Sequence, residues 1–255
     1  NSAHPLSNPT PLTNLLEIIL FLAIGFSLPR TYGLMVGDRR QGRTVTAMMS
    51  LLLLGTTALA VWAETTATSL PGAAMEGKEQ RFGALWSTLC ASATTGTSNG
   101  AVNSMHESFS PLGGGVLLFN MILGEVSPGG VGTGLYGALI LVVLTVFVAG
   151  LMVGRTPELL GKTIGRREIT CVPLSILVMP ALVLLLTGLS LVLPVSRDAL
   201  LAQGPHGLTE MMYAFASASN NNGSAFAGLS ADQPYLNLAL ALAMLVCSRT
   251  RQEPL

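Results

Sequence analysis

Two apolar segments of this chain end in polar, glycine-containing sequence before they are long enough to cross a membrane. The first begins at Leu85 and runs into residues 95–100, and the second begins near Tyr213 and runs into residues 220–223. Each apolar part has about 10–13 residues, whereas a membrane-spanning helix needs about 20. The second copy follows the first by about 120 residues. The pattern predicts two half-helices that each lead to exposed backbone.

Composition places these half-helices in a membrane protein. Half of the residues are hydrophobic and only 10% are charged, which is too little charge for a soluble domain of this size. The net charge is zero, so the chain lacks the excess of positive charge that is typical of a nucleic-acid-binding protein. Its three cysteines lie in apolar segments at irregular spacing, which argues against a disulfide framework and a zinc site. We expect an all-α integral membrane protein that crosses the bilayer several times.

Four apolar segments are long enough to span a membrane: 12–36, 44–63, 135–153 and 171–193. A shorter apolar segment, 116–126, precedes the third, and the octet between them contains four glycines and a proline. Such a sequence cannot hold a regular helix, so we expect one broken membrane helix with an unwound loop at mid-depth.

Basic residues set the expected orientation. The connections 37–43 and 154–170 carry most of the basic residues found in short loops, whereas 64–82 and 194–210 carry few. The positive-inside rule places the first two in the cytoplasm. Both half-helices then enter from the outer face, so the unit of span, re-entrant half-helix, polar strand and span occurs about twice.

The domain organisation follows from these units. We interpret 1–11 as a tail that follows a preceding loop, 12–153 as one unit and 154–170 as a cytoplasmic connection. Residues 171–247 form a second unit whose last helix is short, and 248–255 form an aberrant tail. We expect the chain to be a piece of a longer one.

The polar strands suit a dehydrated monovalent cation. Closely spaced backbone carbonyls can replace the water around potassium or sodium, and glycine adopts the dihedral angles that this requires. The negative end of each half-helix dipole points to the same place. Neither strand contains a carboxylate, which argues against a calcium-type site. The alternative is a pair of structural Asn-Gly turns. The candidate ion-binding residues are Thr95, Ser98, Asn99, Gly100, Asn220, Asn221, Asn222 and Gly223.

Several charged or titratable residues lie near these strands. Glu125 precedes the glycine-rich octet; it either has a functional role, touching the ion path or bracing the loop, or is a hydrogen-bonded structural acid. We expect His106, Glu107 and His206 to be solvated. We also expect a solvated ion-pair cluster, made of Glu76, Lys78, Glu79 and Arg81. No catalytic constellation or phosphate-binding loop occurs, so chemistry by this chain is not expected.

Five stretches resemble a known family. They are 1–5, 37–43, 75–79, 150–158 and 220–228, and they closely resemble the potassium-binding and translocating subunit (KdpA) of the Kdp potassium-transporting ATPase. The resemblance extends from residue 1 to about 246. It implies a component of the bacterial inner membrane, built like a potassium channel from four repeats of which this chain is the third and fourth.

The resemblance also implies roles and partners. The bound ion would be potassium, and ATP would be bound and hydrolysed by a separate P-type ATPase subunit (KdpB-like) rather than by this chain. A short peptide subunit (KdpF-like), together with a small accessory one (KdpC-like), would complete the complex. The glycines of the octet would form a gating loop beneath the filter: Gly129, Gly130, Gly132 and Gly134. Asn99 stands where the family is expected to have cysteine, a change that preserves the backbone role.

Three other functions remain open. A secondary transporter built from broken helices would have inverted repeats, whereas these two units run in the same direction. A channel-like potassium transporter without an ATPase partner would share the half-helices. Finally, the chain could be an inert remnant, because two polar strands cannot surround an ion alone.

Overall fold

The computed structural model describes residues 4, 6–66, 75–130 and 133–252. Within that part of the chain the regular secondary structure is helical except for one short hairpin. Its elements are α1 (Pro11–Met35), α2 (Arg39–Thr66), α3 (Gly83–Gly96), the 3-10 turn η2 (His106–Ser108), α4 (Pro111–Leu123), α5 (Thr133–Val153), the antiparallel strands β1 (Glu158–Leu159) and β2 (Lys162–Thr163), α6 (Arg166–Val192), α7 (Pro194–Arg197), α8 (Pro205–Ser219) and α9 (Pro234–Gln252).

Four helices are long and apolar enough, by length and composition, to cross a membrane: α1, α2, α5 and α6. They coincide with the four segments predicted from the sequence, which confirms those spans to within a few residues. The helices α3 and α8 have 14 and 15 residues. At about 1.5 Å per residue they are too short to cross a hydrocarbon core of about 30 Å.

Local sequence explains where several helices begin. Thr10 caps α1 by accepting a hydrogen bond from the backbone N–H of Thr13, and Pro11 occupies the first turn. Ser110 caps α4 in the same way, again followed by a proline. The cap and Pro111 explain why α4 begins five residues before the apolar run that predicted it.

The predicted helix break is present. The helix α4 ends at Leu123 and α5 begins at Thr133, and the described residues between them, 124–130, are not helical. Gly129 has a positive φ of 76°, which a helix cannot include. We call residues 124–134 the glycine loop; Gly132 lies outside the described residues.

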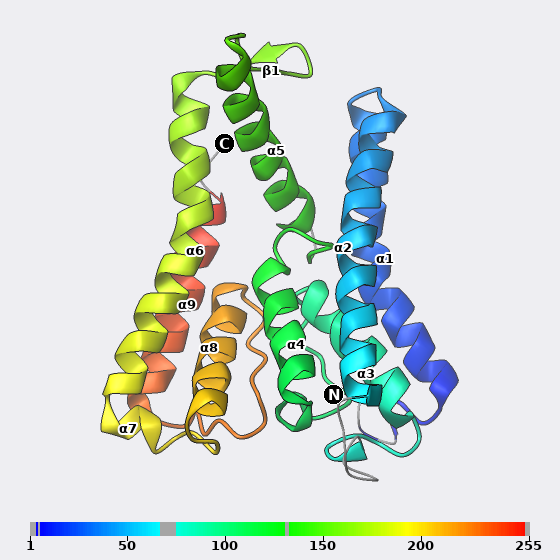
Figure 1. Cartoon of the computed structure of the whole chain (residues 1–255), viewed down its shortest axis with the longest axis vertical. Helices are drawn as coiled ribbons and strands as arrows, with labels where there is room; N and C mark the ends of the chain where they lie inside the picture. The colour runs from blue at the N-terminus through cyan, green and yellow to red at the C-terminus, as the bar shows by residue number, and fades with distance from the viewer. Residues whose placement is uncertain (1–3, 5, 67–74, 131–132, 253–255) are drawn as a thin grey trace.

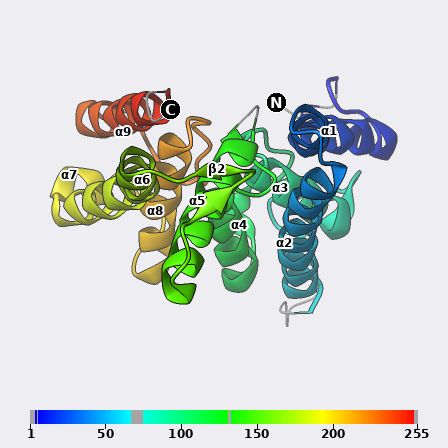
Figure 2. The same ribbon diagram turned by 90° about the horizontal axis from the view of Figure 1, so that it is seen from above.

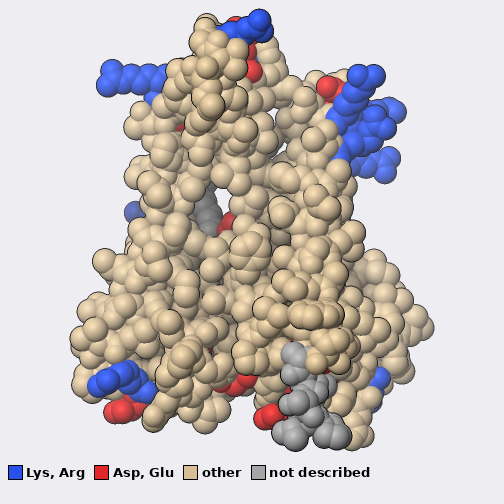
Figure 3. Space-filling model, in the orientation of Figure 1, with Lys and Arg blue, Asp and Glu red and all other residues tan. Residues whose placement is uncertain are grey.

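The two ends of the molecule differ in charge and in structure. The α1–α2 connection and the β1–β2 hairpin lie at one end, at the top of Figure 1, and the half-helices α3 and α8 lie towards the other. Lys and Arg side chains gather at the first end on the face that Figure 3 shows. In two views α4 stands between α3 and α8, and α9 lies beside α6 (Figures 1 and 2).

The last helix is longer than its apolar sequence. The apolar run ends at Cys247, where the sequence predicted a short helix and an aberrant tail, but α9 continues to Gln252. The residues of this extension are polar and basic. They tolerate a helix because its backbone hydrogen bonds do not depend on apolar side chains.

Two glycines bring α1 and α2 into backbone contact. A methyl group placed on Gly42 would lie 2.5 Å from the carbonyl oxygen of Pro29 and 3.0 Å from the Cα of Gly33. Small residues of this kind let helices approach closely in membranes, where packing replaces the hydrophobic effect as the driving force.

We therefore expect Gly42→Val to destabilise the protein by about 1–3 kcal/mol, because the added side chain must separate the two helices. The measurement is the thermal unfolding midpoint of the purified protein in detergent. Gly55→Val is the matched control, since Gly55 lies in the same helix with open space around it. Equal midpoints for the two variants would contradict the close contact.

Candidate functional site

The half-helices α3 and α8 end in the same backbone turn. The residue after each helix cap has a left-handed backbone: φ is 54° for Ser98 after α3 and 61° for Asn221 after α8. The backbone N–H that follows bonds to a carbonyl five residues earlier, at 3.0 Å after α3 and 3.2 Å after α8. This is a Schellman ending. The two Asn-Gly pairs matched in the sequence therefore follow helix ends of one geometry.

The likeness extends into the loops that follow. We call residues 97–100 the first loop and residues 220–223 the second loop. The side-chain oxygen of Asn99 accepts the backbone N–H two residues later at 3.1 Å, and that of Asn222 does the same at 2.9 Å. Gly100 and Gly223 have positive φ values of 83° and 73°, a conformation that favours glycine. Both loops thus combine an asparagine turn with a left-handed glycine.

The first and second loops touch each other. The Ser98 hydroxyl donates to the carbonyl oxygen of Asn220 at 3.2 Å and accepts from the Asn222 amide at 3.1 Å. A methyl group on Gly100 would lie 3.2 Å from the carbonyl oxygen of Asn222. Segments far apart in the chain are therefore brought side by side. Thr95 lies just behind this contact, where its hydroxyl donates to the Ala91 carbonyl at 2.7 Å.

Helix α4 supports the second loop. The side-chain amide of Asn220 donates to the carbonyl oxygen of Met121, and the amide of Asn222 lies 3.1 Å from the Met121 sulfur. Met121 is fully buried in the largest apolar cluster, together with residues of α8 and α9. Met121 of α4 thus links the second loop to the core of the molecule.

The glycine loop lies against the end of α3. The N–H of Gly129 donates to the carbonyl oxygen of Gly96 at 3.0 Å. A methyl group on Gly130 would lie 3.2 Å from the carbonyl oxygen of Thr97, and one on Gly134 would overlap the Pro128 carbonyl. A cavity of about 240 Å³ is lined by α1, the first loop and the glycine loop; its lining residues are Leu20, Phe21, Ile24, Gly25, Thr97, Asn99, Gly129 and Gly130.

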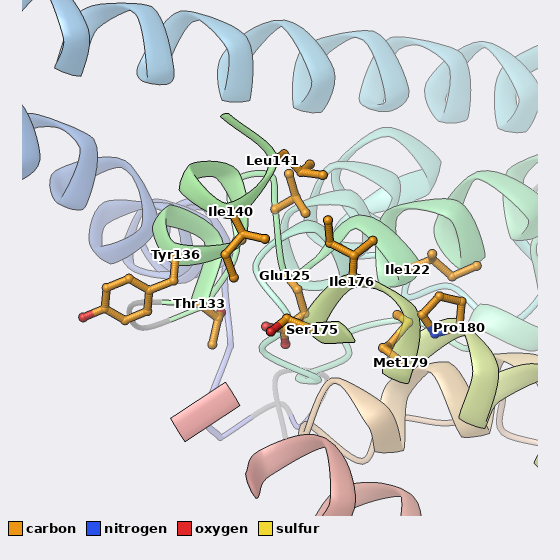
Figure 4. A pocket seen from close by; sticks show the side chains of 12 residues that line it. Ile122, Glu125, Thr133, Tyr136, Ile140, Leu141, Ser175, Ile176, Met179 and Pro180 are labelled. Carbon is orange, nitrogen blue, oxygen red and sulfur yellow. The ribbon is translucent and has the colours of Figure 1, made fainter. Parts of the chain in front are cut away.

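Glu125 lines a second cavity, of about 300 Å³, between α4, α5 and α6 (Figure 4). Its neighbours on the wall include the hydroxyl-bearing residues Thr133, Tyr136 and Ser175, and the rest of the lining is mainly apolar. The Glu125 residue is half-buried. Both interpretations from the sequence, an ion-path residue and a brace for the glycine loop, are compatible with this place.

His106 is not the solvated residue that the sequence predicted. Its side chain is buried, and its Nδ1 lies 3.2 Å from the hydroxyl of Tyr213. Burial lowers the pKa of His106 to about 4, so the ring is neutral at pH 7. Glu107 is also largely buried and pairs at 2.7 Å with His206, which is partly exposed as expected.

Lys78 corrects the predicted surface cluster. Its amino group lies 2.8 Å from a carboxylate oxygen of Glu64, and the two side chains are 0% and 1% exposed. The other Glu64 oxygen accepts the backbone N–H of Ser110 at 2.8 Å, and the Lys78 ammonium lies 4.3 Å above the Phe109 ring. The expected Glu79–Arg81 pair does form, at 3.3 Å. Glu64 is the residue that sequence reasoning missed, because it ends an apolar helix without a local partner.

These geometries accompany a match to a known family. A family model described as "Potassium-transporting ATPase A subunit" matches residues 1–250. The chain belongs to this family. Among its similar members is the potassium-transporting ATPase potassium-binding subunit of Kineococcus radiotolerans, which is 61% identical over 248 residues, 96% of this chain and 44% of the relative.

Two further members give the same result. The potassium-binding subunit of Frankia alni is 59% identical over 249 residues, covering 96% of this chain and 42% of the relative. That of Mycobacteroides abscessus is 54% identical over 257 residues, covering 96% and 45%. The chain therefore spans about half the length of the curated relatives it matches. In the described part of the chain no group of three His, Cys, Asp or Glu side chains could hold a metal ion.

We expect Lys78→Met to destabilise the protein by about 3–5 kcal/mol, because it leaves the Glu64 carboxylate buried without its partner. The double variant Glu64→Gln/Lys78→Met removes both charges and should recover most of that loss. Both are compared with the unmodified protein by thermal unfolding in detergent. A double variant no more stable than Lys78→Met alone would argue against a buried ion pair.

Proposed function

We propose that this chain is part of the potassium-binding subunit of an ATP-driven potassium uptake pump, and that its first and second loops help to select the ion. The observation that carries the proposal is the meeting of two half-helix ends that share one backbone geometry. The family membership and the names of the relatives support potassium as the ion and an ATPase as the assembly.

The chemistry follows from what a helix end exposes. The last carbonyls of a helix lack intrahelical partners and carry its negative partial charge. Here the polar turns after α3 and α8 contact each other, and we infer that their remaining oxygens face a shared ion site. Oxygens of Thr95, Ser98, Asn99, Gly100, Asn220, Asn221, Asn222 and Gly223 would replace part of the water around potassium.

The rest of the ion site would come from the longer protein. Two loops cannot surround an ion, and the curated relatives are about twice as long as this chain. We assign this chain to the third and fourth of four channel-like repeats. The basic end of the molecule would face the cytoplasm of a bacterium whose inner membrane α1, α2, α5 and α6 cross, with lipid around them.

The glycine loop would act as the barrier beneath the ion site. Its hydrogen bond to Gly96 places it directly against the end of α3. Potassium would then leave sideways, towards a P-type ATPase subunit that hydrolyses ATP. A short peptide subunit, together with an accessory one, would complete the pump.

The alternatives make different demands on the structure. An inverted-repeat secondary transporter would have half-helices that enter from opposite ends, whereas α3 and α8 lie at the same end (Figure 1). A potassium transporter without an ATPase shares the loops, but the relatives are named as parts of an ATPase. An inert remnant would not support transport in any assembly.

A chimaeric pump tests the proposal. The 248 matching residues of the Kineococcus radiotolerans protein are replaced by those of this chain and produced with the other subunits of that ATPase. We expect potassium-dependent ATPase activity and potassium uptake in a strain that lacks other uptake systems. A chimaera that assembles with its partners but takes up no potassium would count against the function.

Within this pump, Gly223→Asp should reduce the preference for potassium over sodium roughly tenfold or more. The left-handed glycine gains a side chain at a cost of about 1–2 kcal/mol, and its carboxylate favours the smaller ion. The measurement is ATPase activity as a function of each ion. Gly154→Asp is the matched control, since Gly154 also has a positive φ, of 69°, and open space around it. Equal selectivity in the two variants would remove the second loop from the ion site.

A further inference from the structure

A series of hydrogen bonds runs behind the second loop. The backbone N–H of Ser224 donates to the Asn222 side-chain oxygen at 2.9 Å. The Ser224 hydroxyl lies 3.3 Å from that of Tyr213, which lies 3.2 Å from Nδ1 of His106. His106, Tyr213 and Ser224 are each at most 8% exposed. None of these three buried polar side chains belongs to the proposed ion site.

A neutral His106 ring can complete the series. One of its nitrogens carries a proton and the other accepts. Nδ1 and the Tyr213 hydroxyl can therefore bond with either as donor, and so can the hydroxyls of Tyr213 and Ser224. His106 also lines a cavity of about 470 Å³, together with Asn103 and Ser104. The three side chains are thus linked by two hydrogen bonds.

Aromatic packing fixes where the tyrosine stands. The Tyr213 ring stacks on Phe226 at 4.5 Å, and the His106 ring meets Phe109 edge-on at 5.8 Å. Phe226 lies shortly after the second loop, so Tyr213 contacts both the loop's side-chain network and the segment that leaves it. A tyrosine packed in this way holds Ser224 in place, because closely packed interiors permit little movement.

The series also joins the two units. His106 belongs to the segment that follows the first loop, whereas Tyr213 and Ser224 flank the second. It therefore adds a connection between the units that is separate from the direct contact of Ser98 with Asn222. Asn222 is the residue where both connections end.

We propose that His106, Tyr213 and Ser224 are positioning residues that hold Asn222, and through it the backbone oxygens of the second loop, at the spacing that distinguishes potassium from sodium. This inference rests on the proposed ion-selecting function. None of the three touches the ion. They act because carbonyl oxygens discriminate between ions only while their separation is maintained.

The test is Tyr213→Phe in the chimaeric pump, which removes one hydroxyl and keeps the ring. We expect the apparent KM for potassium, and the concentration of sodium that competes with it, to shift by about three- to tenfold, the range that one lost hydrogen bond gives. The kcat at saturating potassium should stay within about twofold of the unmodified pump, because chemistry occurs in another subunit.

The matched control is Tyr235→Phe. The Tyr235 hydroxyl also pairs with a serine, Ser190 on α6, at 3.2 Å. The Tyr213 hydroxyl lies at the same distance from His106. The Tyr235 pair lies between α6 and α9, away from the loops. This variant should leave both ion parameters unchanged.

A second variant protects the test against failed assembly. Ser224→Ala breaks the link to Tyr213 but keeps the N–H that holds Asn222, and it should shift selectivity in the same direction. If both Tyr213→Phe and Ser224→Ala match Tyr235→Phe, the positioning role is overturned; if the first does not assemble, Ser224→Ala alone decides. If the hydroxyl variants leave ion selectivity unchanged while Gly223→Asp reduces it, only this inference is overturned. If Gly223→Asp also leaves ion selectivity unchanged, the proposed function is overturned.

Discussion

A helix that ends in the interior of a protein leaves its last carbonyl oxygens without helical hydrogen-bond donors, and no bulk water is there to replace them. The rest of this structure depends on how that constraint is met at α3 and α8. Some of these carbonyls are satisfied locally, because each helix ends in a Schellman turn whose backbone N–H groups bond to carbonyls in the last turn of the helix. Another is satisfied by the glycine loop, through the bond from Gly129 to Gly96. The turns beyond these bonds contact each other through Ser98, and this is where we propose the ion site.

The sequence predicted the features that follow from length and hydropathy. The four spans, the two half-helices and the interrupted helix all follow from how many apolar residues occur in succession and from where glycine interrupts them. The sequence also predicted that Gly100 and Gly223 would adopt backbone angles that other residues disfavour, and both have positive φ. The left-handed conformation of Ser98 had no such signal, since serine does not favour it, and only the closing of the α3 terminus requires it.

Burial after the loops could not be read from the sequence in the same way. His106 and Lys78 lie in polar surroundings in the chain, and polar surroundings usually indicate solvent. Their burial depends on residues beyond their immediate neighbours: Tyr213 lies 107 positions from His106, and Glu64 is at the end of α2. The His106 contact forms between the two units, whereas the Lys78 contact forms within the first one. The local pattern therefore identified the loops but not the side chains that support them.

Helix α4 is linked to the ends of both half-helices by different means. Its residue Met121 holds the second loop through Asn220, and the chain leaving its C-terminal end carries Gly129 to the end of α3. The same chain continues into α5, which reaches the basic end of the molecule (Figure 1). An axial displacement of α4 would thus act on both half-helix ends together. This short helix therefore provides a route by which the basic end of the molecule can communicate with both candidate loops.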